Sequence, residues 1–135
     1  MTSTPSPLPS LNDPHVLAEI TAMSDRYEKA LGDNALEELD ALFYDGPETI
    51  RYGVGENLYG FSEIQAFRRA RTGGSPPRDV LRRVITTIGQ NVATVDLEFR
   101  RRGGQKTGRQ SQTWIRTPEG WKILAAHVSL MADVS

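Results

Sequence analysis

Residues 80–130 read VLRRVITTIGQNVATVDLEFRRRGGQKTGRQSQTWIRTPEGWKILAAHVSL and decide the fold class. The short turns GQN, RGGQK and PEG separate four β-rich runs, which span residues 80–89, 91–101, 107–117 and 121–130. In the second run the apolar residues Ala93, Val95, Leu97 and Phe99 share one parity. Because strand side chains alternate between two faces, this stretch predicts four consecutive antiparallel strands with one buried face.

Helical signals precede these strands. Asp13 is suited to cap a helix, Pro14 fits its first position, and Gly32 follows its last periodic residue. A second, shorter helix is predicted from a capping Asn34 to Phe43. The first forty or so residues therefore predict two helices and no strand.

The segment between these helices and the four strands predicts one more strand and one more helix. ETIRYG at 48–53 is typical of a strand, and the glycine-rich GVGENLYG at 53–60 is expected to break it. A third helix follows, with Ser62 and Gln65 in capping-box spacing. Three helices ahead of four strands predict an α+β fold, with the helices on one face of a strongly curved antiparallel sheet.

Length and composition narrow the class of protein. The chain of 135 residues fits a single domain, expected over 13–132, and the Ser-, Thr- and Pro-rich residues 1–12 are expected to form a disordered arm. A net charge of −1 argues against a nucleic-acid partner, and no apolar run approaches the ~20 residues of a membrane span. The absence of cysteine and of a signal-peptide pattern favours a cytoplasmic location.

Arginines concentrate in two clusters, Arg68-Arg69-Arg71 and Arg100-Arg101-Arg102. Exposed arginines are usually solvated surface residues that serve no binding function. The alternative is that the two clusters attract small anions toward a cleft. The sequence leaves both interpretations open.

The sequence lacks the residues that several common types of catalysis need. His15 and His127 are the only histidines, and neither stands in an HxH or HExxH motif or beside a carboxylate cluster. The glycines of GVGENLYG match neither a dinucleotide-binding nor a phosphate-binding loop, and no serine stands in a nucleophile elbow. We therefore expect no metal and no cofactor.

Some polar residues stand in patterns that otherwise look buried. Tyr27 lies on the apolar stripe of the first helix, where a core tyrosine is the simpler interpretation. Arg51 lies in the middle of a short strand, and if it points inward it needs a carboxylate or a ligand, because an unpaired buried charge costs several kcal/mol. The polar run Gln110, Ser111 and Gln112 occupies a central strand, where ordinary sheet packing is equally plausible.

The last strand suggests the wall of a small-molecule pocket. One parity of this strand holds Trp121, Ile123, Ala125, His127 and Ser129. A face that is apolar at one end and polar at the other is a common lining for such a pocket. The alternative interpretation is that His127 is a core histidine whose ring nitrogens have hydrogen-bond partners within the protein.

Three long segments are similar to the AtzH-like family, which includes the HpxZ-like proteins of oxalurate catabolism and belongs to the SnoaL/NTF2-like superfamily. They are TIRYGVGENLYGFSEIQAFRRAR, VITTIGQNVATVDLEFRR and GRQSQTWIRTPEGWKILAAHVSL. The likeness covers roughly residues 16–130. It implies the NTF2-like cone of helices on a bent sheet, and a homodimer formed through the outer face of that sheet.

The resemblance also implies an activity. Proteins of this family are associated with cyanuric acid and oxalurate breakdown beside amidase-signature hydrolases, and they convert 1,3-dicarboxyurea to allophanate without a metal. The family's catalytic tyrosine and arginine correspond to Tyr27 of SDRYEKAL and Arg51 of TIRYG. Candidate substrate-binding residues of this site are His127, Gln112, Ser129, Asn57 and Tyr59.

Two other functions stay open at this point. One is a non-catalytic protein that binds a small molecule or assists an amidase-signature hydrolase, because cones of this superfamily often bind without catalysis. The other is a proton shuttle of the ketosteroid-isomerase kind, which needs a carboxylate base opposite the tyrosine. The plausible bases are Asp40, Glu56 and Asp96, and none stands in the usual motif.

Overall fold

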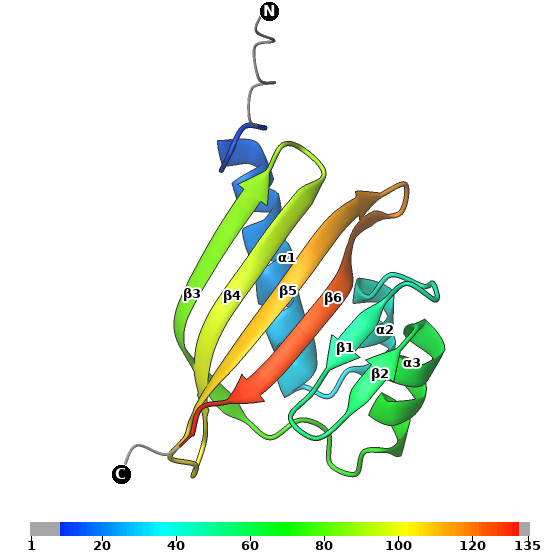
Figure 1. The fold of residues 1–135 in the computed structure, drawn as a ribbon, viewed down its shortest axis with the longest axis vertical. Coiled ribbons are helices and arrows are strands. Elements are labelled where there is room, and N and C mark those ends of the chain that lie inside the picture. The colour runs from blue at the N-terminus through cyan, green and yellow to red at the C-terminus, as the bar shows by residue number, and fades with distance from the viewer. Residues whose placement is uncertain (1–8, 133–135) are drawn as a thin grey trace, which may run out of the picture.

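The computed structural model describes residues 9–132, which form three helices and one six-stranded sheet (Figure 1). In chain order the elements are α1 (Pro14–Gly32), α2 (Leu36–Leu42), β1 (Ile50–Tyr52), β2 (Asn57–Tyr59), α3 (Phe61–Ala70), β3 (Arg78–Ile88), β4 (Val92–Arg101), β5 (Thr107–Thr117) and β6 (Gly120–Leu130). The strand order is β2-β1-β6-β5-β4-β3. The α+β class predicted from the sequence is confirmed.

The sheet is antiparallel except between β1 and β6, which run parallel. The four long strands β3 to β6 lie where the sequence predicted them. β2 was not predicted, because its residues belong to the glycine-rich segment expected to break the sheet. There the amide of Gly53 donates to the carbonyl of Glu56 at 2.9 Å, and this tight turn lets β2 fold back onto β1.

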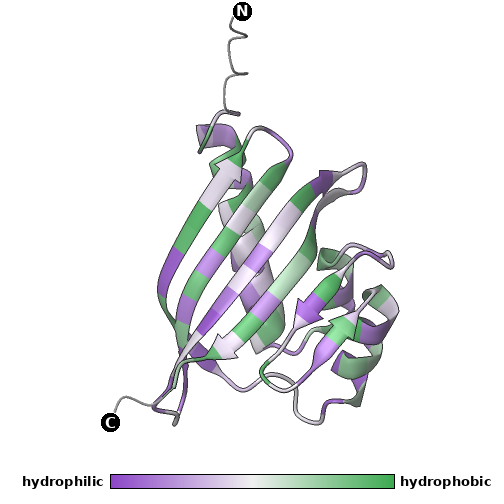
Figure 2. Ribbon diagram, in the orientation of Figure 1, coloured by the Kyte–Doolittle hydropathy of each residue, from purple (hydrophilic) through white to green (hydrophobic). Residues whose placement is uncertain are grey.

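Helix α1 crosses one face of the sheet behind the long strands (Figure 1). Its cap is the predicted one: the Asp13 carboxylate accepts from the amides of His15 at 3.0 Å and Val16 at 3.4 Å. The buried face of α1 consists of Val16, Ile20, Ser24, Tyr27 and Ala30. This face makes the core with the inward side chains of the long strands, whose alternating hydropathy is visible along β4 in Figure 2.

The caps of α2 and α3 differ from the prediction. Asn34 adopts a left-handed conformation with φ of 51°, and Ala35 takes the cap position of α2. The capping box expected at Ser62 is wrong, because the cap position of α3 is Gly60, two residues earlier, with φ of 87°. Instead the Glu63 carboxylate accepts from the amide of Tyr59 at 2.9 Å and thereby ties α3 to β2.

The N-terminal arm lies partly outside the described residues, which begin at residue 9. Residues 9–12 pair with the sheet edge, where Leu11 forms a bridge to Ile88 and the Asn12 amide donates to the Thr87 carbonyl at 3.0 Å. These four residues were expected to be disordered, but they lie against the edge of the sheet. Among the described helices, none combines the length and apolar character needed to cross a membrane.

Candidate functional site

A cavity of about 200 Å³ lies between the C-terminal half of α1, the hairpin β1–β2, α3 and the inner face of the long strands. Its lining consists of Tyr27, Leu31, Arg51, Val54, Glu56, Phe67, Arg71, Ser75, Pro76, Arg78, Phe99, Arg101, Gln110 and Val128. Five of these residues are charged and several are apolar. The cavity therefore combines strong charges with a partly apolar wall, as expected of a site for a small ion.

Tyr27 reaches the cavity from the buried face of α1. Its side chain is only 5% exposed, and its ring packs against Phe43 with the centroids 6.4 Å apart. Within the described residues its hydroxyl makes no hydrogen bond. A buried phenol normally has a partner, so the hydroxyl is available to a ligand in the cavity.

Arg51 lies on β1, between Leu58 of β2 and Ala126 of β6, and points to the inner face of the sheet. Its guanidinium donates to the Glu56 carboxylate at 3.0 Å, and the side chain is 15% exposed. An inward arginine needs such a partner, as the sequence pattern implied. Its remaining N–H groups stay available for a second anion.

Gly53 makes room for this ion pair. A Cβ atom at position 53 would lie 1.8 Å from Glu56 Oε1. A larger residue would therefore push the Glu56 carboxylate off the Gly53 backbone and away from Arg51. The strings RYG and GEN of the sequence thus form one local structure, in which a glycine lets the acid reach the arginine.

Two further arginines of the cavity differ in their partners. Arg78 is ion-paired with Glu28 at 2.5 Å and donates to Gln110 Oε1 at 3.0 Å. Arg71 has no carboxylate partner among the described residues, and its buried Nε has no acceptor. Burial, and after it the positive charge of Arg51, lower the pKa of Arg71 from its ordinary value.

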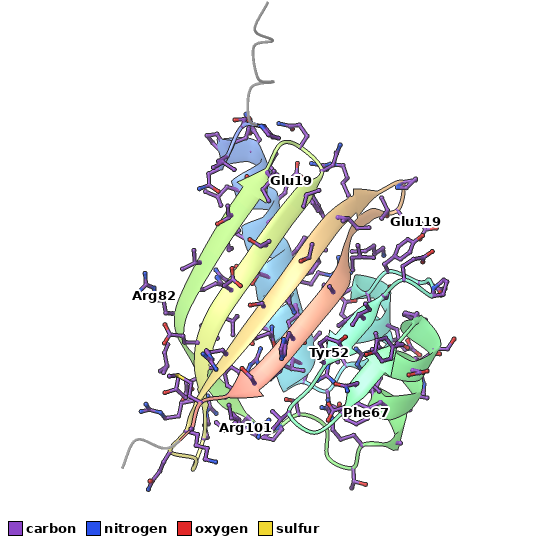
Figure 3. The ribbon with its side chains drawn as sticks, viewed as in Figure 1. Glu19, Tyr52, Phe67, Arg82, Arg101 and Glu119 are labelled. Carbon is purple, nitrogen blue, oxygen red and sulfur yellow. The ribbon has the colours of Figure 1, made fainter. Side chains whose placement is uncertain are left out.

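Phe67 of α3 contacts both Arg51 and Arg71. The guanidinium carbons of Arg51 and Arg71 each lie 5.6 Å from the centre of its ring. Figure 3 shows Phe67 and Arg101 toward the same end of the molecule, where β6 ends. The aromatic ring thus supports two positive groups at one wall of the cavity.

Two buried glutamines follow one another on the inner face of β5. Gln110 lines the cavity, with its carbonyl oxygen taken by Arg78 and its amide nitrogen without a partner among the described residues. Gln112, expected at the site, accepts from Trp114 Nε1 at 3.1 Å and does not line this cavity. Of the polar run in this strand, Gln110 is therefore the residue that faces the ligand space.

Four predicted site residues lie elsewhere. The expectation that His127 joins Tyr27 and Arg51 is wrong, because its ring stands on the outer face of the sheet against Tyr52, with the centroids 5.6 Å apart. Tyr59 is on the same outer face, 3.1 Å from the Tyr52 hydroxyl. Asn57 and Ser129 complete the set outside the cavity.

A β-bulge explains the error at His127 and Ser129. Trp114 pairs with Ile123 and Thr113 pairs with Ala125, so one residue of β6 is left without a counterpart. The bulge reverses the alternation of buried and exposed residues. Before the bulge Trp121 and Ile123 are buried, and after it Ala126 and Val128 are buried. The parity read from the start of the strand therefore fails at its end.

Sequence reasoning did not assign Arg71, Arg78 or Arg101 to the site. Arg101 shares the parity of Phe99 along β4, and Arg71, the C-cap residue of α3, follows Phe67 by four residues. These spacings could have identified one member of each arginine cluster as facing inward. Of the two interpretations of the clusters, the attraction of anions toward a cleft fits these two residues.

Of the three carboxylates considered as the base of a proton shuttle, one lines the cavity and two do not. Glu56 lines the cavity but is held by Arg51, whereas Asp40 is paired with Arg68 and Arg69. Asp96 is exposed on β4. Over residues 9–132 no group of three or more His, Asp or Glu side chains is placed to bind a metal ion.

Comparison with known proteins gives the following likenesses. A family model described as AtzH-like matches residues 9–134. A protein of unknown function from Pectobacterium atrosepticum is 52% identical, with 90% of this chain and 95% of that chain covered and a TM-score of 0.88. A cystatin-like fold protein from Burkholderia xenovorans is 43% identical, with 93% and 99% covered and a TM-score of 0.88.

More distant structures share the fold. An NTF2-like superfamily protein from Salmonella enterica is 27% identical, with 90% of this chain and 94% of that chain covered and a TM-score of 0.73. A putative ketosteroid isomerase from Parabacteroides distasonis is 16% identical with a TM-score of 0.68, and shows the fold alone. No curated protein matches the chain.

Proposed function

Because this chain belongs to the AtzH-like family, we propose that it is a small enzyme that decarboxylates 1,3-dicarboxyurea to allophanate without a metal or cofactor. The observation that carries the proposal is that Tyr27 and Arg51 line one small cavity whose charged residues are mostly arginines. A volume of about 200 Å³ suits a compact anion better than a drug-sized ligand, which takes about 300–1,000 Å³.

The proposed reaction breaks one bond between a urea nitrogen and the carbon of a carboxylate. The electron pair of that bond passes to the nitrogen, a proton joins the nitrogen, and carbon dioxide and allophanate are released. Tyr27 donates the proton, and water restores it afterwards. A positioned proton donor contributes about 10²–10⁴-fold to a rate.

Arg51 orients the substrate in this proposal. Its planar guanidinium offers two parallel N–H groups to one carboxylate, while Glu56 fixes the guanidinium from the other side. Both Tyr27 and Arg51 are largely buried, so the reacting carboxylate leaves bulk water when it binds. A drier environment favours neutral carbon dioxide over the carboxylate.

The test is carbon dioxide release from 1,3-dicarboxyurea, generated in the assay by a partner amidase. Wild type is expected to speed the release, and Arg51→Lys to lose most of the gain although it keeps the charge, because the two-point contact is lost. Arg102→Gln is the control, since Arg102 is exposed and its ion pair within residues 9–132 is with Asp79. If Arg51→Lys matches wild type, the site assignment fails.

A non-catalytic role beside an amidase-signature hydrolase is the competing function, and the same assay separates the two. A binding or accessory protein would leave the release of carbon dioxide at its spontaneous rate. The partnership with such a hydrolase, the homodimer and the cytoplasmic location stay predictions.

A further inference from the structure

The cavity carries more positive charge than one carboxylate would neutralise. Of its four arginines, Arg51 and Arg78 have carboxylate partners, Glu56 and Glu28. Among the described residues Arg71 has none, and neither has Arg101. The cavity therefore has a local excess of positive charge that suits a ligand with two negative groups.

Unpartnered donors mark where the second group would bind. Arg71 Nε and Gln110 Nε2 are both buried and have no acceptor among the described residues. Gln110 is only 2% exposed, and its carbonyl oxygen is already held by Arg78. Buried donors without partners cost stability, so their presence at a cavity indicates a ligand that supplies the acceptors.

Arg51 and Arg71 are close enough for one small molecule to contact both. The guanidinium carbons of Arg51 and Arg71 both lie 5.6 Å from the Phe67 ring centre, so they are at most twice that distance apart. Tyr27, Arg51, Arg71, Gln110 and Arg101 all line this one cavity.

We propose that Arg71, with Gln110 and Arg101, forms a second carboxylate subsite that holds the carboxylate retained in the product. This inference rests on the proposed function for its substrate, but the subsite itself is a site for small dicarboxylates. The carboxylate that leaves then lies at the other end, beside Tyr27 and Arg51.

The subsite gives a physical reason for the reaction to stop after one decarboxylation. Allophanate has a single carboxylate, and the second subsite holds it away from Tyr27. The reactive end of the cavity then faces the uncharged amide of allophanate, from which no carbon dioxide can leave. The same residues that bind the substrate therefore protect the product.

Binding of two simple probes tests the subsite without any reaction. Malonate has two carboxylates and acetate has one, and calorimetry measures both affinities. Wild type is expected to bind malonate at least about tenfold more tightly than acetate, and Arg71→Gln to lose about tenfold or more for malonate while acetate changes little. Arg102→Gln removes the same charge from an exposed position and is expected to bind malonate like wild type.

The kinetic test uses the same variants with 1,3-dicarboxyurea. A contact made equally in the bound and the reacting state raises KM and leaves kcat within about threefold. We expect this pattern for Arg71→Gln, together with weaker inhibition by allophanate.

The two proposals fail in different ways. Equal binding of malonate and acetate by wild type, or equal loss in Arg71→Gln and Arg102→Gln, would overturn the subsite. Preferential malonate binding without any decarboxylation would overturn the proposed function and leave the subsite standing.

Discussion

At the scale of single side chains, the proton donation proposed for Tyr27 can be tested with one substitution. Tyr27→Phe removes only the hydroxyl, while the ring keeps its contact with Phe43. We expect kcat to fall by about 10²-fold with unchanged folding, because a positioned proton donor is lost. Carbon dioxide release measures the rate, and circular dichroism with thermal unfolding provides the folding control.

A wild-type rate in Tyr27→Phe would assign proton donation to another group, most directly to water. A rate that falls together with the unfolding temperature would instead make Tyr27 a core residue, which is the simpler interpretation of its place on α1.

The two catalytic candidates were found from the sequence, and most of their neighbours were not. Tyr27 and Arg51 interrupt apolar patterns with a hydroxyl and a charge, but their catalytic role was implied only by the resemblance to the AtzH-like family. Arg71 and Arg101 were hidden in clusters whose other members are exposed or paired elsewhere. The direction of an arginine at a helix end or a strand end depends on where that element stops, which local sequence defines poorly.

At the scale of elements, a buried ion pair joins α2 to α3. Asp40 of α2 accepts hydrogen bonds from Arg68 at 2.8 Å and from Gln65 at 3.0 Å, and it forms an ion pair with Arg69 at 2.9 Å. Arg68 is 6% exposed, and burial lowers the pKa of its guanidinium from the ordinary value. Since α3 carries Phe67 toward the cavity, this pair holds the wall of the site in place.

Removing the acid is therefore expected to be costly. Asp40→Ala leaves the Arg68 charge buried without its carboxylate, a change that typically costs about 3–5 kcal/mol. Urea unfolding monitored by circular dichroism measures the loss. Asp33→Ala serves as the control, because Asp33 pairs with Lys29 on the exposed side of α1 and should show no measurable change. Equal stability of the two variants would contradict the structural role of Asp40.

The long elements follow from local patterns, and the irregular ones do not. α1 and the strands β3 to β6 have clear periodicity, recognisable turns and a good cap, so their positions were predicted closely. The hairpin β1–β2 depends on pairing with the distant strand β6, as between Arg51 and Ala126, and the bulge in β6 depends on its register with β5. That bulge, which local sequence does not encode, moved His127 from the expected pocket to the opposite face.

At the scale of the whole molecule, the outer face of the sheet is the expected dimer interface. Val84 of β3 is 44% exposed on this face, and across the sheet it aligns with Asp96, Ser111 and His127. A two-fold dimer brings the same surface of each copy together, so a new charge there is repeated on both sides. We predict a dimer for wild type and a monomer for Val84→Glu in sedimentation velocity.

The control for this prediction is Ala22→Glu, which adds the same charge to an exposed position of α1. It is expected to leave the dimer intact. A monomeric wild type, or dissociation in both variants alike, would contradict an interface on the outer face of the sheet.

For the molecule as a whole, the proposed activity is the removal of one carbon dioxide from a carboxylated urea in this cavity. The most direct measurement follows 1,3-dicarboxyurea labelled with ¹³C at its carboxylates by NMR, using protein dialysed against EDTA. We predict rapid transfer of half of the label to carbon dioxide and bicarbonate, with the other half retained in allophanate, and a much slower transfer with Arg51→Lys. Decay at the spontaneous rate with wild type, or a rate restored only by added metal, would contradict the account.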